Sequence, residues 1–171
     1  MAEVTSRERL KPSLLDRLTD HSPEQRRESI EMAAQSGSQL RESVRRDLGW
    51  LFNTVQLSSA MPQLAEYPEV SRSVLNFGIP DLAGRALSSL DPRELEKVLR
   101  ATILQYEPRL LRNTVNMRVA ADKTQMGQNS VVFYVEASLW SQPVPVSLYL
   151  RTELNLEDGS VRVEEVDAGA K

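Results

Sequence analysis

The stretch Ala101-Thr-Ile-Leu-Gln-Tyr-Glu-Pro-Arg-Leu110 marks the point where the chain changes from helical to strand-like patterning. The segment before it opens with Asp91-Pro92, a typical helix start, and its apolar residues then recur every three or four positions. Pro108 disfavours helical dihedral angles at the residue before it. The sequence therefore predicts a helix that ends near Tyr106.

Glu107 and Arg109 place opposite charges on the two sides of this proline. If the three residues are extended, both side chains point the same way, because alternate residues of an extended chain share a face. One interpretation is an internal salt bridge that joins the helix to the following sheet, since paired buried charges are more often structural than functional. The other is that both charges point outward and contact another subunit.

A second helix is predicted to begin at Ser38, after Gly37, because it carries the strongest helical periodicity in the chain. Its apolar stripe consists of Leu40, Val44, Leu48, Leu51, Phe52 and Val55. Trp50 lies off this stripe and is expected to contact the sheet or a partner. Residues 58–70 are interpreted as a loop, and residues 70–84 as either strand or helix with positive φ at Gly78 and Gly84.

After Arg109, apolar and polar residues alternate as they do in strands with one buried face. The expected strands cover residues 115–120, 131–139, 144–154 and 161–166, and the turn signals are Met126–Asn129, Gln142-Pro143 and Asp158-Gly159. The predicted fold class is α+β. N-terminal helices pack on one face of a C-terminal antiparallel sheet of three to four strands.

The predicted domain organisation has four parts. Residues 1–20 form an N-terminal arm with a short amphipathic docking segment, residues 21–37 a linker or short helix, residues 38–166 a single α+β domain, and residues 167–171 a disordered tail. In the docking segment, Ser13 is placed to cap a helical turn. Leu10, Leu14, Leu15 and Leu18 form its apolar stripe. This stripe packs either on the domain itself or on another protein.

Composition excludes several function classes. Residues 1–50 carry nine basic and nine acidic side chains, and residues 51–150 carry the same numbers, so no basic stripe is available for nucleic acid. The chain has no cysteine, one histidine and no Gly-rich phosphate loop, so no metal or cofactor is expected. No apolar run resembles a signal peptide or a membrane span, and a cytoplasmic protein is predicted.

Glycoside hydrolysis needs only two carboxylates, and Glu107 with Glu136 or Glu66 is the candidate pair for a peptidoglycan hydrolase. Arg109 speaks against it, because an adjacent guanidinium favours a charged carboxylate while a general acid must carry a proton. We therefore predict a non-enzymatic protein with no catalytic residues. A small autonomous binding adaptor is a further alternative, and the neighbouring genes would distinguish it.

Four ordered segments resemble a known family, and together they extend from about residue 9 to residue 156. They are Arg9–Asp20, Leu40–Thr54, Ser73–Leu82 and Tyr106-Glu-Pro-Arg-Leu110. The family is the TssE-like baseplate subunits of type VI secretion systems, which are related to a contractile-phage baseplate wedge subunit once labelled lysozyme-like. Tyr106 departs from the phenylalanine expected in many relatives but keeps the aromatic ring.

The resemblance implies a structural part of a cytoplasmic baseplate wedge near the bacterial inner membrane, with TssF, TssG and TssK as partners. It also implies a role in starting the sheath of TssB and TssC. The family signature maps onto Glu107, Pro108 and Arg109, and the wedge contacts onto Leu14, Leu15 and Leu18. On this basis, Arg109→Ala is predicted to leave the fold intact and to abolish sheath assembly. No direct membrane insertion is expected.

Overall fold

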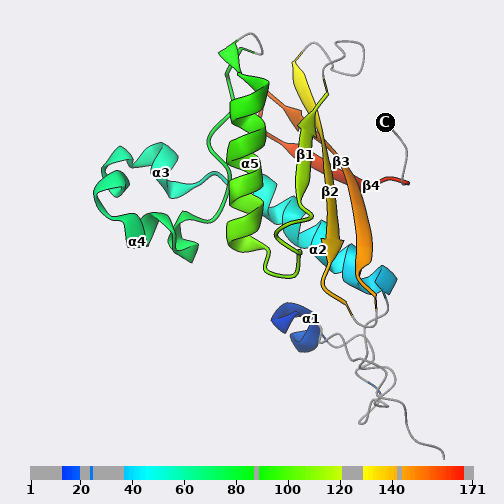
Figure 1. Cartoon of the computed structure of the whole chain (residues 1–171). Helices are drawn as coiled ribbons and strands as arrows, with labels where there is room; N and C mark the ends of the chain where they lie inside the picture. The colour runs from blue at the N-terminus through cyan, green and yellow to red at the C-terminus, as the bar shows by residue number, and fades with distance from the viewer. Residues whose placement is uncertain are drawn as a thin grey trace, which may run out of the picture.

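The computed structural model describes residues 13–19, 24, 37–86, 89–120, 129–141 and 144–167. Two long helices, α2 (Gly37–Phe52) and α5 (Pro92–Tyr106), accompany strands β1 (Asn116–Val119), β2 (Ser130–Leu139), β3 (Val146–Asn155) and β4 (Val161–Glu165). The strands form an antiparallel sheet in the order β1-β2-β3-β4, with α2 and α5 packed on one face (Figure 1). The predicted α+β fold is confirmed.

Local sequence explains where α5 begins and ends. Asp91 caps the helix by accepting a hydrogen bond from the Arg93 amide at 2.9 Å, and Pro92 occupies the first position. The helix ends at Tyr106, as predicted from Pro108. Its Leu99 and Ile103 side chains are completely buried, and each contributes about 1.5–3 kcal/mol by leaving water.

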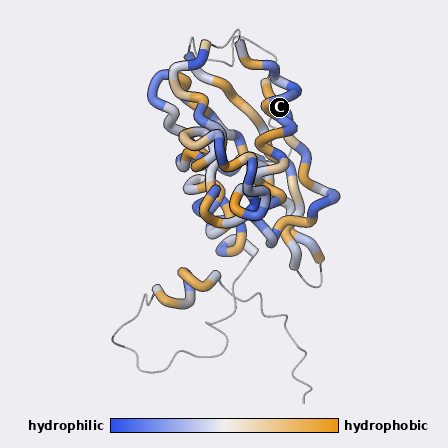
Figure 2. Tube along the Cα trace, turned by 90° about the vertical axis from the view of Figure 1, so that its left-hand side faces the viewer, coloured by the Kyte–Doolittle hydropathy of each residue, from blue (hydrophilic) through white to orange (hydrophobic). Residues whose placement is uncertain are grey.

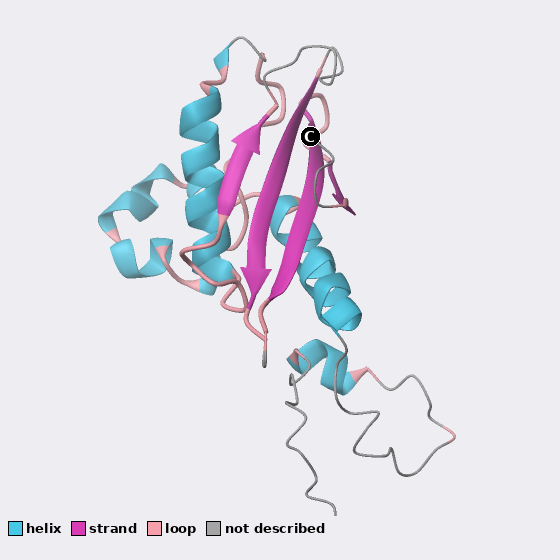
Figure 3. Ribbon diagram, turned by 45° about the vertical axis from the view of Figure 1, so that its right-hand side comes forward, coloured by secondary structure: helices cyan, strands magenta, loops and turns pink. Residues whose placement is uncertain are grey.

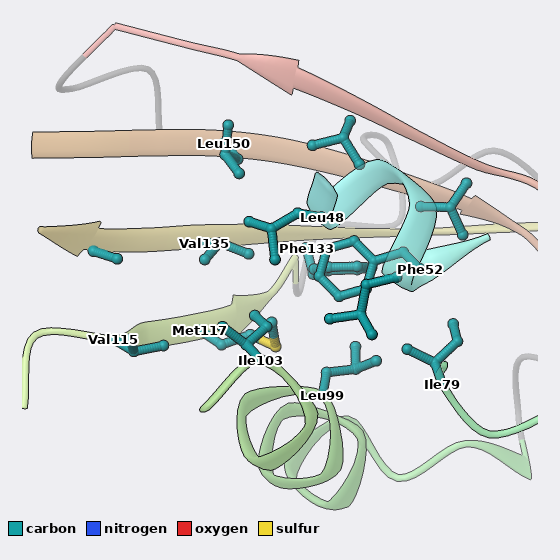
Figure 4. Close-up of a cluster of buried hydrophobic side chains, with 14 of the residues drawn as sticks. Leu48, Phe52, Ile79, Leu99, Ile103, Val115, Met117, Phe133, Val135 and Leu150 are labelled. Atoms are coloured by element: carbon teal, nitrogen blue, oxygen red, sulfur yellow. The ribbon is translucent and has the colours of Figure 1, made fainter. Parts of the chain in front are cut away.

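The core lies between these helices and the sheet (Figure 4). Leu48 and Phe52 of α2 point toward the strands, and the Phe52 ring meets the edge of Phe133 of β2 with 5.5 Å between ring centroids. The predicted apolar stripe of α2 is buried except at Val55. That residue lies beyond the helix end, is 54% exposed, and forms a parallel bridge with Ile79. The helix also begins one residue earlier than predicted, at Gly37.

Residues 57–76 form a lobe that projects from the side of α5 away from the sheet (Figure 1). It contains α3 (Leu57–Ala60), η1 (Pro62–Glu66), α4 (Pro68–Ser71) and η2 (Val74–Asn76), where η marks a 3-10 helix. The prediction of a loop over residues 58–70 is wrong, because Pro62 and Pro68 start short helices instead of preventing them. Residues 70–84 contain η2 and turns, with positive φ at Gly78 and Gly84 as predicted.

The face of the sheet opposite the helices is polar. It displays Arg118, Tyr134, Glu136, Arg151 and Glu153, and Arg151 pairs with Glu153 at 3.2 Å. β3 and β4 are joined at the predicted Asp158-Gly159 turn, where Gly159 has a φ of 75°. Figure 3 shows that α5 lies near β1 and that α2 lies near β3 and β4. No described helix combines the length and apolar character needed to cross a bilayer.

Some predictions concern residues outside the described part of the chain. These are the arm before Ser13, most of the linker at 21–37, the turn at Met126–Asn129 up to residue 128, the Gln142-Pro143 turn, and the tail after Asp167.

Candidate partner-binding site around Glu107-Pro108-Arg109

The end of α5 turns the Glu107 side chain into the protein. Glu107 is the C-terminal cap of the helix, and its amide still donates to the Ile103 carbonyl at 2.8 Å. The residue is only 5% exposed. Leu110 enters the core on the other side and forms a bridge with Leu139 of β2. The Glu-Pro-Arg segment therefore connects the main helix to the sheet.

Arg109 pairs with Glu107 through two parallel hydrogen bonds. Its Nε donates to Glu107 Oε1 at 2.7 Å and its Nη2 to Oε2 at 2.5 Å, and the Arg109 amide also donates to Oε1 at 3.1 Å. This forked geometry is the strong form of an arginine–carboxylate pair. The expectation that the two side chains point the same way is met, because they bind each other.

Side chains of α2 complete the surroundings of Arg109. Its Nη2 donates to Asp47 Oδ2 at 2.6 Å, and its Nη1 donates to Ser43 Oγ at 3.3 Å. Burial alone lowers the pKa of the guanidinium, but the hydrogen bonds and charges of Glu107 and Asp47 outweigh burial and raise that pKa. Arg109 therefore holds its charge and its position tightly.

The expectation that both charges point outward is wrong for Glu107, because Arg109 and the end of α5 cover it. Arg109 keeps 24% of its side chain exposed, and Pro108 is exposed beside it. The internal salt bridge is present. Partner contact by Glu107, Pro108 and Arg109 stays a prediction, and in this geometry Pro108 and the open edge of Arg109 would carry it.

The N-terminal segment lies next to this site. Helix α1 (Leu14–Leu18) is capped by Ser13, as predicted, whose hydroxyl accepts from the Asp16 amide at 3.2 Å. Asp16 pairs with Arg46 of α2 at 2.6 Å. Leu14 and Leu18 are 69% and 74% exposed, whereas Leu15 faces the site. Leu15 is itself 45% exposed, so the domain covers only part of one leucine of the stripe. Figure 2 shows α1 as an apolar element at one end of the molecule.

A mainly apolar groove of about 480 Å³ lies between α1, α2 and the Glu-Pro-Arg segment. Its lining includes Leu15, Trp50, Leu51, Phe77, Tyr106 and Pro108, with Asp47, Glu107 and Arg109 as charged members. Trp50 is half-exposed, and the Arg46 guanidinium carbon lies 5.0 Å from its ring centroid. Trp50 therefore lines the groove, and its expected contact with a partner stays a prediction.

A family model described as baseplate wedge protein gp25 matches residues 38–144 of this chain. The chain belongs to the baseplate wedge protein gp25 family. The match includes α2, α5, β1, β2 and the Glu-Pro-Arg segment, and it confirms the wedge family inferred from the four sequence segments. Comparison with curated proteins and with solved structures gave no match.

Membership of the baseplate wedge family assigns a structural role in a baseplate. The geometry also weakens the hydrolase alternative. Both carboxylate oxygens of Glu107 accept hydrogen bonds from Arg109, so neither is presented to a substrate. Glu66 on η1 and Glu136 on β2 are exposed, and no hydrogen bond or ion pair joins either of them to Glu107 within the described residues.

Sequence reasoning missed the residues of α2 that hold Arg109. Ser43 and Asp47 are four residues apart and share a helix face, which is a visible signal of a polar pair beside the apolar stripe. Nothing in the sequence connects that face to Arg109, because the partners Asp47 and Arg109 are 62 positions apart.

Proposed function

We propose that this wedge-family chain is the TssE-like subunit of a type VI secretion baseplate. In this role it binds the wedge proteins TssF, TssG and TssK in the bacterial cytoplasm near the inner membrane, and it starts the sheath by binding TssB and TssC. Family membership supports the baseplate part of the proposal. The observation that supports sheath binding is a sheet edge, on β4, that keeps unpaired backbone groups.

The register of β4 decides which of its groups are free. Ser160 and Val166 bond to β3, so Val161, Val163 and Glu165 direct their backbone groups away from the sheet. Asn53, in the turn just after α2, binds both the amide and the carbonyl of Val161, and Arg45 of α2 binds the Val163 carbonyl. Within the described residues, the Val163 amide and both backbone groups of Glu165 have no hydrogen-bond partner, and all three lie toward the end of the strand. Such groups accept an added strand.

The opposite edge is less suitable. At the β1 edge, Arg100 of α5 donates to the carbonyl of Val115, just before the strand, at 2.9 Å. Glu96 of α5 accepts from the Val119 amide at 2.8 Å. Met117 lies between these two covered positions. A strand added at β1 would have to displace side chains on both sides of Met117. We therefore place the sheath strand on β4.

Glu165→Pro is expected to weaken binding of TssB–TssC by about tenfold, because it removes one outward amide that a sheath strand would use. Proline is tolerated at an edge position whose amide faces away from the sheet, so the fold is retained. Binding is measured by titration of labelled chain with TssB–TssC, and folding by circular dichroism.

The matched control is Glu165→Ala, which keeps the amide and loses only the half-exposed 2.7 Å ion pair with Arg41. It is expected to bind the sheath proteins like the unaltered chain. If both variants bind TssB–TssC equally weakly, the effect belongs to the Glu165 side chain. If neither variant loses binding, β4 is not the edge that accepts the sheath strand.

The apolar groove and α1 form the second proposed surface, which contacts the wedge proteins. Leu14→Ser with Leu18→Ser is expected to weaken binding to TssF–TssG by about tenfold, because two exposed apolar anchors are lost. The free energy of unfolding should change by less than about 0.5 kcal/mol, as both side chains already face water. Co-purification from cells and thermal melting measure the two effects.

The matched control for this pair is Val74→Ser on η2, an apolar residue that is 79% exposed and does not line the groove. It should leave wedge binding unchanged. Unchanged binding by the Leu14 and Leu18 variant would place the wedge contact elsewhere on the chain.

A further inference from the structure

A continuous series of ion pairs joins the two proposed partner-binding segments. Asp16 of α1 binds Arg46 at 2.6 Å, Arg46 binds Asp47 at 2.9 Å, and Asp47 binds Arg109 at 2.6 Å. Arg109 ends the series on Glu107 at 2.5 Å. Helix α1 and the Glu-Pro-Arg segment have no ion pair with each other in the described residues, so α2 supplies the electrostatic link between them.

The two members from α2 each divide their bonds between neighbours. Arg46 uses Nη1 for Asp16, and Nε and Nη2 for Asp47. Asp47 uses Oδ1 for Arg46 and Oδ2 for Arg109. Arg46 and Asp47 each bind two partners. When one of these bonds is lost, the atoms that made it can bind the remaining partner more strongly. Groups within one such network are energetically coupled.

We propose that Arg46 and Asp47 are positioning residues that couple the docking of α1 to the availability of Arg109. When α1 leaves, Arg46 loses Asp16 and turns fully to Asp47. Asp47 then holds Arg109 less tightly, and the guanidinium becomes available to acceptors on a second partner. This inference rests on the proposed function, since it assumes that both segments bind partners.

This coupling sets the order in which the two partners bind. A wedge protein that takes the α1 leucines draws α1 from Arg46 and prepares Arg109 for the next contact. Linkage requires the reverse effect as well: a partner that binds Arg109 favours release of α1 by the same factor by which that release favours binding of the partner. The two states of the device are α1 docked on Arg46 and α1 released from it.

The sign of each substitution follows from the charges. Arg109→Gln leaves Asp47 without its second cation, so Asp47 draws Arg46 away from Asp16 and α1 docks less. Asp47→Asn removes the competing carboxylate, so Arg46 turns to Asp16 and α1 docks more. A residue that only supports the fold would lower docking when either side is altered, and opposite signs therefore identify coupling.

The absence of cysteine permits a direct measurement on the full chain. Thr19→Cys, one turn after Leu15 at the exposed end of α1, is labelled with bimane, and contact quenching by Trp50 reports the docked fraction. Trp140→Phe removes the other tryptophan. The docked-to-released ratio is expected to fall about threefold with Arg109→Gln and to rise about threefold with Asp47→Asn. The double variant should show the same rise as Asp47→Asn alone, because Arg109 acts on α1 only through Asp47.

Arg100→Gln is the matched control, since within the described residues Arg100 of α5 binds backbone carbonyls only and lies outside the series. It should not change the ratio. Should Arg109→Gln fail to fold, Asp47→Asn alone decides, because only coupling predicts a rise. A ratio unchanged or lowered by Asp47→Asn would overturn the proposal. The measurement uses no partner, so its failure is separate from failure of sheath or wedge binding.

Discussion

Arg109→Ala is expected to lower the free energy of unfolding by about 3–5 kcal/mol, because it leaves a buried carboxylate without its partner. Glu107 is 5% exposed and receives three hydrogen bonds from Arg109, one of them from the backbone amide, which the substitution keeps. Asp47 loses its cation as well. Urea unfolding followed by circular dichroism measures the loss.

This expectation replaces the one drawn from sequence, in which Arg109→Ala leaves the fold intact. Arg100→Ala is the control, because Arg100 is exposed and its partners in the described part of the chain are backbone carbonyls. This substitution should cost about 1 kcal/mol or less. A loss below about 1 kcal/mol for Arg109→Ala would mean that water reaches Glu107 and that the pair is not structural. A defect in sheath assembly by this variant is informative only at temperatures where the variant remains folded.

Gly78→Ala is expected to destabilise the chain by about 3 kcal/mol, because two separate penalties act at this position. Gly78 has a φ of 130°, a backbone conformation that residues with a side chain rarely adopt. An added Cβ would also overlap the Thr54 carbonyl. That carbonyl already accepts the Ile79 amide at 2.8 Å, and the Gln56 amide donates to the Ile79 carbonyl at 2.9 Å. The backbone therefore cannot move away without loss of these bonds.

Gly49→Ala supplies the opposite control. Gly49 lies within α2, and a Cβ there would meet no atom within 4 Å. Alanine is favoured over glycine inside a helix, so this variant should gain about 0.5–1 kcal/mol. Denaturant melts of the two variants should therefore move in opposite directions. A similar small change in both would show that the turn at Gly78 adapts to a side chain.

Features fixed by short-range chemistry were predictable from sequence. The end of α5 follows from Pro108, the α1 cap from Ser13, and the positive φ values from Gly78 and Gly84. The four strands follow from alternation, because one face of the sheet packs on helices. The short helices within residues 57–76 were missed because prolines there both end one turn and start the next.

Features fixed by distant contacts were not predictable. The sequence places Glu107 and Arg109 on one side of the chain, but only the packing of α2 against the end of α5 decides that this side is internal. The unpaired backbone groups at the β4 edge were also not predictable from sequence. Their number depends on Asn53 and Arg45, which are 108 and 118 positions away from their strand partners.

The central claim is that the sheath begins by adding a strand to β4. Hydrogen exchange of the Val163 and Glu165 amides, with and without TssB–TssC, tests it most directly. We expect both amides to exchange freely in the isolated chain and to become protected on binding, while the Arg162 and Glu164 amides, which face β3, are protected in both states. Stable binding of the sheath proteins with no added protection at Val163 and Glu165 would contradict the account.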